Sequence, residues 1–356
     1  MGFLDRFIDR EKASDLTLKD PREVFTNILK QTSGSSVVRE LKYDIFYQII
    51  GFKGVVEGVG TSTLVANTAI ALASLGLTVC VVDTSILAPV QDVLLKSNYV
   101  GNNVEEKNRL DWFDMPYTKL SPLHSSSISK NISILSFYGK NRGITDILST
   151  NDSSALVEIA FSELHNKFDI ILVDCCSELS SINTAALQMS QSVIQVWNDS
   201  PSVLGCLDSF ITHCVTLSCP LDKMRYVVYS KINPDVMGNI DELLNEYRLH
   251  KLAQTVISRD ISRVINIGKP LWQYPERNED IEGYTNAIID IVCHICNIDR
   301  SGKPIHKGTI TSNDIMEGRV DGTLTKKLKD MEDDLDIATD LETADKQLNR
   351  RKGGRE

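Results

Sequence analysis

Apolar and polar positions along the middle of the chain fall into two kinds of block. Short apolar runs end at a glycine or an aspartate, and longer segments place small and apolar residues at helical spacing. Unbroken apolar runs are typical of parallel strands that are covered on both faces. Strands that alternate with helices predict an α/β fold with a doubly wound, mostly parallel sheet flanked by helices. The strands are expected within residues 43–54, 77–83, 132–139, 168–174, 192–199 and 225–232, and helices within 64–76 and 153–167.

This pattern predicts three parts of the chain. Residues 1–42 hold a short amphipathic helix over 1–12 and a polar linker. Residues 43–298 form the α/β domain, in which the Ser-, Asn- and charge-rich stretch 101–131 is expected to be an irregular insertion. Residues 299–356 begin as a flexible, polar linker and continue as a charged helical tail. The helix 1–12 is expected either to contact a membrane surface peripherally or to pack on protein.

Composition narrows the class of protein. The 356 residues are 42% hydrophobic and 24% charged, which excludes a wholly disordered or fibrous chain. The net charge of −10 disfavours a surface that binds nucleic acid throughout, although a local basic patch remains open. The sequence contains no run of 18 apolar residues, so no membrane-spanning helix is predicted. We therefore expect a cytoplasmic protein, with membrane association as an alternative, and we expect its eight cysteines to be reduced.

The segment between the first strand and the first helix carries the clearest chemical signal. A strand, a glycine-rich loop and a helix in this order point backbone N–H groups and the positive end of the helix dipole at one place, which suits phosphate. Glycines 58 and 60 permit the tight turn, and the Ser62 hydroxyl suits Mg²⁺. The alternative is a turn that only joins strand and helix. The predicted nucleotide-binding residues are Gly58, Val59, Gly60, Thr61, Ser62 and Thr63.

The order of these segments resembles the ParA/MinD superfamily of deviant Walker ATPases, a SIMIBI-class P-loop family. Its loop reads KGGVGK[ST]T, the next strand ends in a D-x-D element, and a later apolar strand ends in aspartate. The resemblance covers residues 45–297 and implies ATP and Mg²⁺ as cofactors. It assigns Ser62, Asp83 and Asp174 to the metal, with Asp83 and Asp174 as the catalytic groups if the protein is active. The matching pieces are residues 56–63, 78–95, 168–174, 192–211, 226–235 and 265–288.

Three positions depart from the family pattern. The family's signature lysine aligns with Val56, its P-loop lysine with Thr61, and its second D-x-D carboxylate with Ser85. Phosphoryl transfer depends on such charges, and the loss of one typically costs a factor of about 10²–10⁵ in rate. We therefore predict a degenerate nucleotide site with very low or absent ATPase activity. Residues 58–63 read GVGTST, which resembles the altered loop of TadZ/CpaE-like pilus-localisation proteins.

The resemblance implies a positioning or scaffold protein that acts in partition, polar localisation or assembly of a secretion or pilus machine. It implies a homodimer, and the helical tail 323–348 offers a surface for a protein partner. Two alternatives stay open. One is an active ATPase that takes its cation from elsewhere, for which Lys53 is a candidate. The other is a DNA-binding partition protein.

The tail prediction is testable by truncation. Leu324, Leu328, Met331 and Leu335 form a heptad-like stripe that is too short for a stable isolated helix in water. We expect this segment to become helical on burial against a partner or a second copy. Truncation at Ser301 should leave the melting temperature of the α/β domain unchanged and abolish the interaction. A truncated chain that unfolds would show instead that the tail packs on its own domain.

Overall fold

The computed structural model describes residues 45–300, apart from 46, 87, 98–122, 138–152, 178–179, 218, 220, 234–239 and 268–277. The helix 1–12 and the tail helix 323–348 lie outside the described residues, as does most of the insertion 101–131. The three-part division of the chain therefore stays a prediction.

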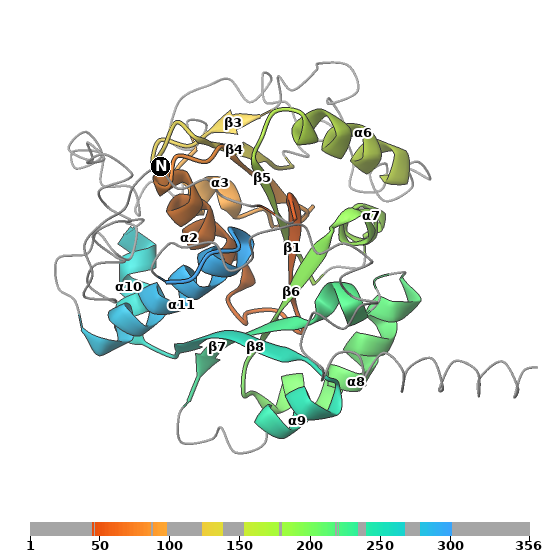
Figure 1. Ribbon diagram of the computed structural model, residues 1–356, viewed down its shortest axis with the longest axis vertical. Coiled ribbons are helices and arrows are strands. Elements are labelled where there is room, and N and C mark those ends of the chain that lie inside the picture. Colours follow the sequence, from red (N-terminus) through yellow and green to blue (C-terminus); the bar gives the residue numbers. More distant parts are fainter. Residues whose placement is uncertain are drawn as a thin grey trace, which may run out of the picture. The chain divides into compact units, whose positions relative to one another are not determined.

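Eight strands form one sheet in the order β3-β4-β2-β5-β1-β6-β7-β8 (Figure 1). Neighbouring strands are parallel, except that β3 runs antiparallel to β4. This confirms the predicted doubly wound, mostly parallel sheet. The strands are β1 (Ile49–Gly54), β2 (Val79–Asp83), β3 (His124–Ser125), β4 (Ile132–Leu135), β5 (Ile170–Cys175), β6 (Ser192–Trp197), β7 (Tyr226–Ile232) and β8 (His250–Val256).

Helices cover both faces of the sheet. Figure 1 shows α2, α10 and α11 on one side of the strands, and α6, α7 and α8 on the other. The α-helices are α2 (Thr61–Ser74), α3 (Gln91–Leu94), α6 (Ser153–His165), α7 (Ser181–Met189), α8 (Pro201–Thr216), α9 (Ile240–Glu246), α10 (Arg259–Ile267) and α11 (Glu279–Ile295), and a short 3₁₀ helix spans Leu221–Met224.

Two strands differ from the sequence expectation. The stretch 101–131 was expected to be irregular throughout, but β3 lies within it and pairs with β4. The sequence pattern also did not indicate β8. In β8, exposed or half-buried residues surround two buried positions, so the strand lacks the continuous apolar run that marks the central strands.

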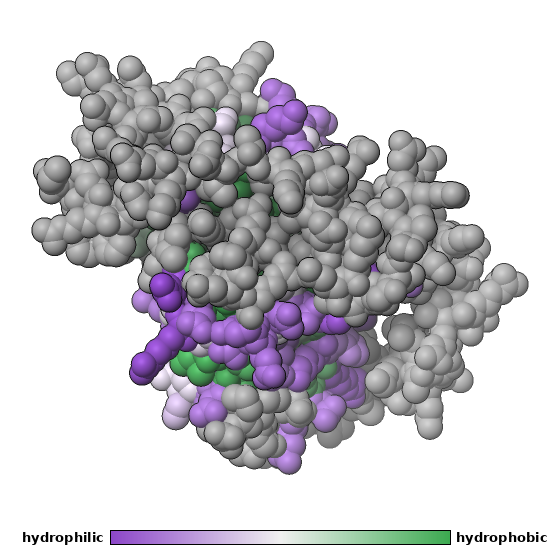
Figure 2. All heavy atoms as spheres, turned by 90° about the vertical axis from the view of Figure 1, so that its left-hand side faces the viewer, coloured by the Kyte–Doolittle hydropathy of each residue, from purple (hydrophilic) through white to green (hydrophobic). Residues whose placement is uncertain are grey.

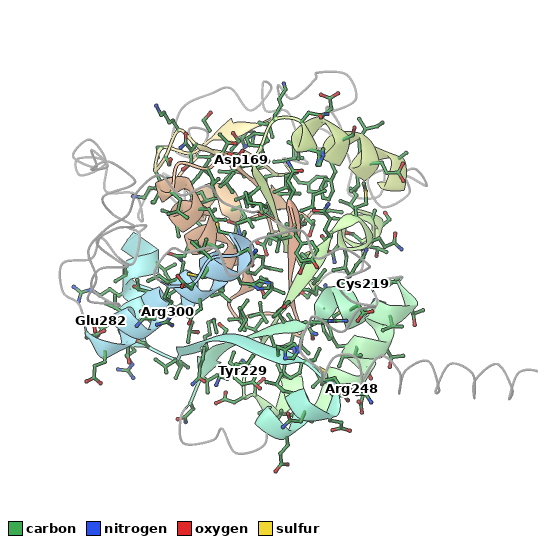
Figure 3. All side chains as sticks on the ribbon, viewed as in Figure 1. Asp169, Cys219, Tyr229, Arg248, Glu282 and Arg300 are labelled. Carbon is green, nitrogen blue, oxygen red and sulfur yellow. The ribbon has the colours of Figure 1, made fainter. Side chains whose placement is uncertain are left out.

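The core is centred on β1, every residue of which is buried between β5 and β6. Phe52 and Trp197 are fully buried, and the Trp197 ring stacks on Tyr229 of β7 at 6.3 Å between centroids. Asp169, labelled with Tyr229 in Figure 3, accepts hydrogen bonds from the N–H (2.7 Å) and hydroxyl (2.8 Å) of Thr78, which ties the start of β5 to the start of β2. The carboxyl ends of the central strands are thereby aligned at one edge.

The described surface is mostly hydrophilic on the face shown in Figure 2. Hydrophilic residues surround a small apolar area on the described part of the face in Figure 2. Within the described residues, no helix is long and apolar enough to cross a membrane.

All eight cysteines fall among the described residues, and all are free thiols, as predicted.

Candidate functional site

The loop between β1 and α2 has the backbone of an anion-binding turn. Gly58 and Gly60 adopt positive φ angles of 78° and 100°, which side chains other than glycine rarely tolerate. Gly60 caps α2 without a side-chain hydrogen bond, and the first helical bond runs from the Leu64 N–H to the Gly60 carbonyl at 3.0 Å. The N–H groups of residues 61–63 therefore have no partner within the helix. They lie at the positive end of the helix dipole and suit a phosphate group.

The end of β7 packs directly on this loop. The Lys231 Nζ donates a hydrogen bond to the Gly58 carbonyl at 2.6 Å. A Cβ atom on Gly60 would lie 2.9 Å from the Ser230 Oγ and 3.3 Å from the Lys231 Cε, so a larger residue would have to displace these side chains. Lys231 itself has a left-handed backbone, with φ of 57°, and its N–H donates to the Thr255 hydroxyl at 3.0 Å. A lysine distant in sequence thus supplies positive charge to a loop that has lost its own lysines.

Two charged residues near the loop point elsewhere. Lys53 of β1 does not extend over the loop, because its side chain is buried and its Nζ donates to the Cys176 carbonyl. The Glu57 carboxylate accepts a hydrogen bond from the Ser177 hydroxyl at 2.8 Å, so it is held by the segment after β5. Lys53 is therefore not the replacement cation that the sequence suggested.

Asp83 and Asp174 end up next to each other. They are register partners on the adjacent strands β2 and β5, and both are buried. The Asp83 carboxylate accepts three backbone N–H groups, from Ser85 (3.0 Å), Val90 (2.8 Å) and Gln91 (3.0 Å). Burial, together with the charge of Asp174, nevertheless raises the pKa of Asp83 to about 8.

The Asp174 carboxylate is tied to the loop helix. Its Oδ2 accepts the Gln91 side-chain amide at 2.7 Å, and the same amide donates to the Ser62 carbonyl at 3.0 Å. Burial raises the pKa of Asp174, while hydrogen bonds from Gln91 and the Ser62 hydroxyl oppose that shift. The three residues assigned to a metal, Ser62, Asp83 and Asp174, are thus linked through Gln91.

This arrangement fits one part of an Mg–nucleotide better than the other. The loop backbone and Lys231 suit the phosphates. Magnesium needs oxygen ligands at about 2.0–2.1 Å in octahedral geometry, and the Asp174 Oδ2 already accepts the Gln91 amide at 2.7 Å. As the groups stand, the loop suits a phosphate, whereas the Asp174 oxygen is held by an amide instead of a metal, so we derive no chemical step through the metal.

The remaining predicted residues shape the loop. Val59 is buried in the core, and the Thr61 hydroxyl lies 2.7 Å from the position that a Cβ on Gly54 would occupy. The Thr63 carbonyl accepts the Asn67 side-chain amide at 2.9 Å, one turn further along α2. Sequence reasoning missed Lys231 and Gln91. The signal for Lys231 was a lysine at the carboxyl end of a predicted strand, whereas nothing in the local pattern marked Gln91.

Comparisons with known proteins agree with this fold. A family model described as an AAA domain matches residues 47–218. The septum site-determining protein MinD of Thermotoga maritima is 25% identical over 229 residues, which are 60% of this chain and 77% of that protein. A ParA family ATPase from Chlorobium tepidum superposes with a TM-score of 0.54 at 17% identity, covering 70% of this chain and 99% of that one. MinD of Pyrococcus horikoshii, solved in complex with Mg-ADP, gives a TM-score of 0.51 at 17% identity, covering 68% and 95%.

The buried carboxylate pair predicts a pH dependence of stability. The native protein keeps a proton on Asp83 up to about pH 8, whereas the unfolded chain releases it near the ordinary pKa of 3.8. Unfolding between these values releases a proton, so the free energy of unfolding should fall as the pH rises from 4 to 8. Urea unfolding at pH 5 and pH 8 measures the slope. An Asp83→Asn variant should be less stable at pH 5 and show a flatter slope; an unchanged slope would contradict the assignment.

Proposed function

Because the chain is similar in sequence and in fold to MinD and ParA P-loop ATPases, we propose that it is a positioning or scaffold protein that binds a nucleotide without useful hydrolysis. The observation that carries this proposal is a phosphate-binding loop that keeps its geometry while Val56 and Thr61 occupy the family's lysine positions. Such a site binds but lacks the charges that stabilise a transferring phosphoryl group. Its output is then the conformation or assembly state of the protein.

The nucleotide would be held by this chain's backbone and by one remote lysine. The N–H groups of residues 61–63 at the start of α2 are the donors to the phosphates, and the Lys231 ammonium group lies against the Gly58 carbonyl. A bound nucleotide supplies negative charge that both the helix dipole and Lys231 stabilise. The solved MinD structure with Mg-ADP supports a nucleotide as the ligand class of this fold.

The scaffold role rests on surfaces beyond the loop. We propose a homodimer and a protein partner that binds the tail helix 323–348, with the N-terminal helix 1–12 as a peripheral membrane contact. Family relatives include a septum site-determining protein and a ParA family ATPase, and these names support positioning as the general class. The cargo that this chain positions is left to experiment.

The first test is turnover. ATPase activity of the purified protein should equal the background of an Asp174→Ala preparation, because two cations and one carboxylate of the family's site are replaced. Restoring only the P-loop lysine, with Thr61→Lys, should leave turnover at background. Steady hydrolysis that Asp174→Ala abolishes would instead favour the alternative of an active ATPase.

The second test is the source of positive charge at the loop. Replacement of Lys231 by methionine should weaken ADP binding about tenfold or more, since a hydrogen bond to a charged group contributes about 1.5–3 kcal/mol. Lys231→Arg should retain most of the affinity. Lys251 of β8 is the matched control, because its Nζ lies over the Tyr229 ring at 5.0 Å and Lys251→Met leaves the loop intact. The ADP affinities are measured by isothermal titration calorimetry. Equal losses of affinity in Lys231→Met and Lys251→Met would contradict a specific role for Lys231.

A further inference from the structure

Gln91 occupies an unusual place for a neutral side chain. It is the first residue of α3, it is fully buried, and its amide lies between the loop helix and the end of β5. The amide nitrogen donates to two acceptors, the Ser62 carbonyl at 3.0 Å and the Asp174 carboxylate at 2.7 Å. The Gln91 backbone N–H donates to the Asp83 carboxylate at 3.0 Å. One residue therefore contacts all three residues that the family pattern assigns to a metal.

The orientation of this amide follows from its neighbours. Each NH₂ hydrogen has an acceptor, the Ser62 carbonyl or the Asp174 carboxylate. A flipped amide would place the Gln91 oxygen against both of these acceptors, which is unfavourable. In the observed orientation that oxygen is buried, and it has no hydrogen-bond partner among the described atoms. The side chain is thus held by its donor end alone, and the donor end points at the carboxylate.

A hydrogen-bond donor in this position stabilises the carboxylate charge, as a cation would. The partial positive charge of the NH₂ group offsets the buried charge of Asp174, as an ion bound there would. It also joins β5 to the start of α2, which a metal bound to Ser62 and Asp174 would do. An amide N–H and a divalent ion cannot both use the Asp174 Oδ2 along the same direction, because the amide nitrogen is already 2.7 Å away.

We propose that Gln91 is a built-in substitute for the divalent cation, so that the loop binds a nucleoside di- or triphosphate without a metal. The ligand class rests on the proposed function, whereas the exclusion of metal rests on Gln91 alone. The loop helix and β5 are already held together before any ligand arrives. Nucleotide binding then needs no cation to organise the site, and a cation can enter only after the Gln91 amide has left.

The decisive experiment uses a metal without nucleotide. Free Mn²⁺ is followed by electron paramagnetic resonance as the full-length protein is added. The wild-type protein should not bind Mn²⁺ at the loop site, so the signal of free Mn²⁺ should not fall. Gln91→Glu keeps the shape of the side chain but replaces the donor with a third carboxylate, which together with Asp83 and Asp174 forms an oxygen-rich site that suits Mn²⁺. We expect this variant to bind Mn²⁺ at least about tenfold more tightly than the wild type.

The matched control is Gln188→Glu. Gln188 of α7 also donates its side-chain amide to a backbone carbonyl, that of Leu217 at 2.9 Å, but among the described residues this amide donates to no carboxylate. It should gain no Mn²⁺ affinity. If Gln91→Glu proves unstable in EDTA, its melting temperature should rise with added Mn²⁺, because binding to the folded state alone stabilises it. The control should show no such rise.

A second arm tests nucleotide directly. The ADP affinity of the wild type should change by less than about twofold between EDTA and saturating Mg²⁺. Tight Mn²⁺ binding by the wild type that Asp174→Ala removes would overturn the proposal, as would a tenfold gain in ADP affinity with Mg²⁺. Neither result bears on turnover, which tests the proposed function separately. A wild type that binds no ADP would contradict the proposed function, and the Mn²⁺ arm would still decide the role of Gln91.

Discussion

A carboxylate that is removed from water needs hydrogen bonds from the protein in place of those from water. In this protein two adjacent carboxylates meet that need together. Asp83 and Asp174 end neighbouring strands in register, and both are buried. The turn after β2 curls back so that its N–H groups reach Asp83, and α3 begins where Gln91 reaches Asp174. The backbone N–H groups of Ser85, Val90 and Gln91 supply these hydrogen bonds to Asp83, and the Gln91 side chain supplies one to Asp174. The loop is therefore built on a compensated pair of acids.

Much of the fold was predictable because a doubly covered parallel sheet leaves a simple trace in sequence. Strands buried on both faces must be apolar throughout, and β2, β5 and β6 consist largely of such runs. The glycines at 58 and 60 also fixed the position of the loop, since their positive φ angles exclude most other residues. The fold class was accordingly confirmed, and the comparisons support the predicted likeness to ParA/MinD ATPases. The site assignments within the loop remain predictions that await ligand-binding data.

The parts that escaped prediction depend on contacts between distant segments. β8 borders the sheet and is half exposed, so its pattern lacks a strand's unbroken apolar run. Lys231 and Gly58 are 173 residues apart, and Gln91 and Asp174 are 83 apart. Lys53 was a reasonable candidate by proximity in sequence, but the buried path of β1 directs it to the Cys176 carbonyl. Which lysine reaches the loop is decided by strand order, and no local pattern encodes strand order.

The close approach of β7 to the loop links two regions that are separated by β6 in the sheet. The pairing of β7 with β8 shifts register between Tyr229 and Ile232, and Lys231 lies within that irregularity. Its ammonium group holds the Gly58 carbonyl, and Ser230 abuts Gly60. The edge pair of strands and the loop therefore meet through the side chains of Ser230 and Lys231. The irregular pairing near Lys231 thus gives the loop a neighbour from a strand that is not adjacent to β1 in the sheet.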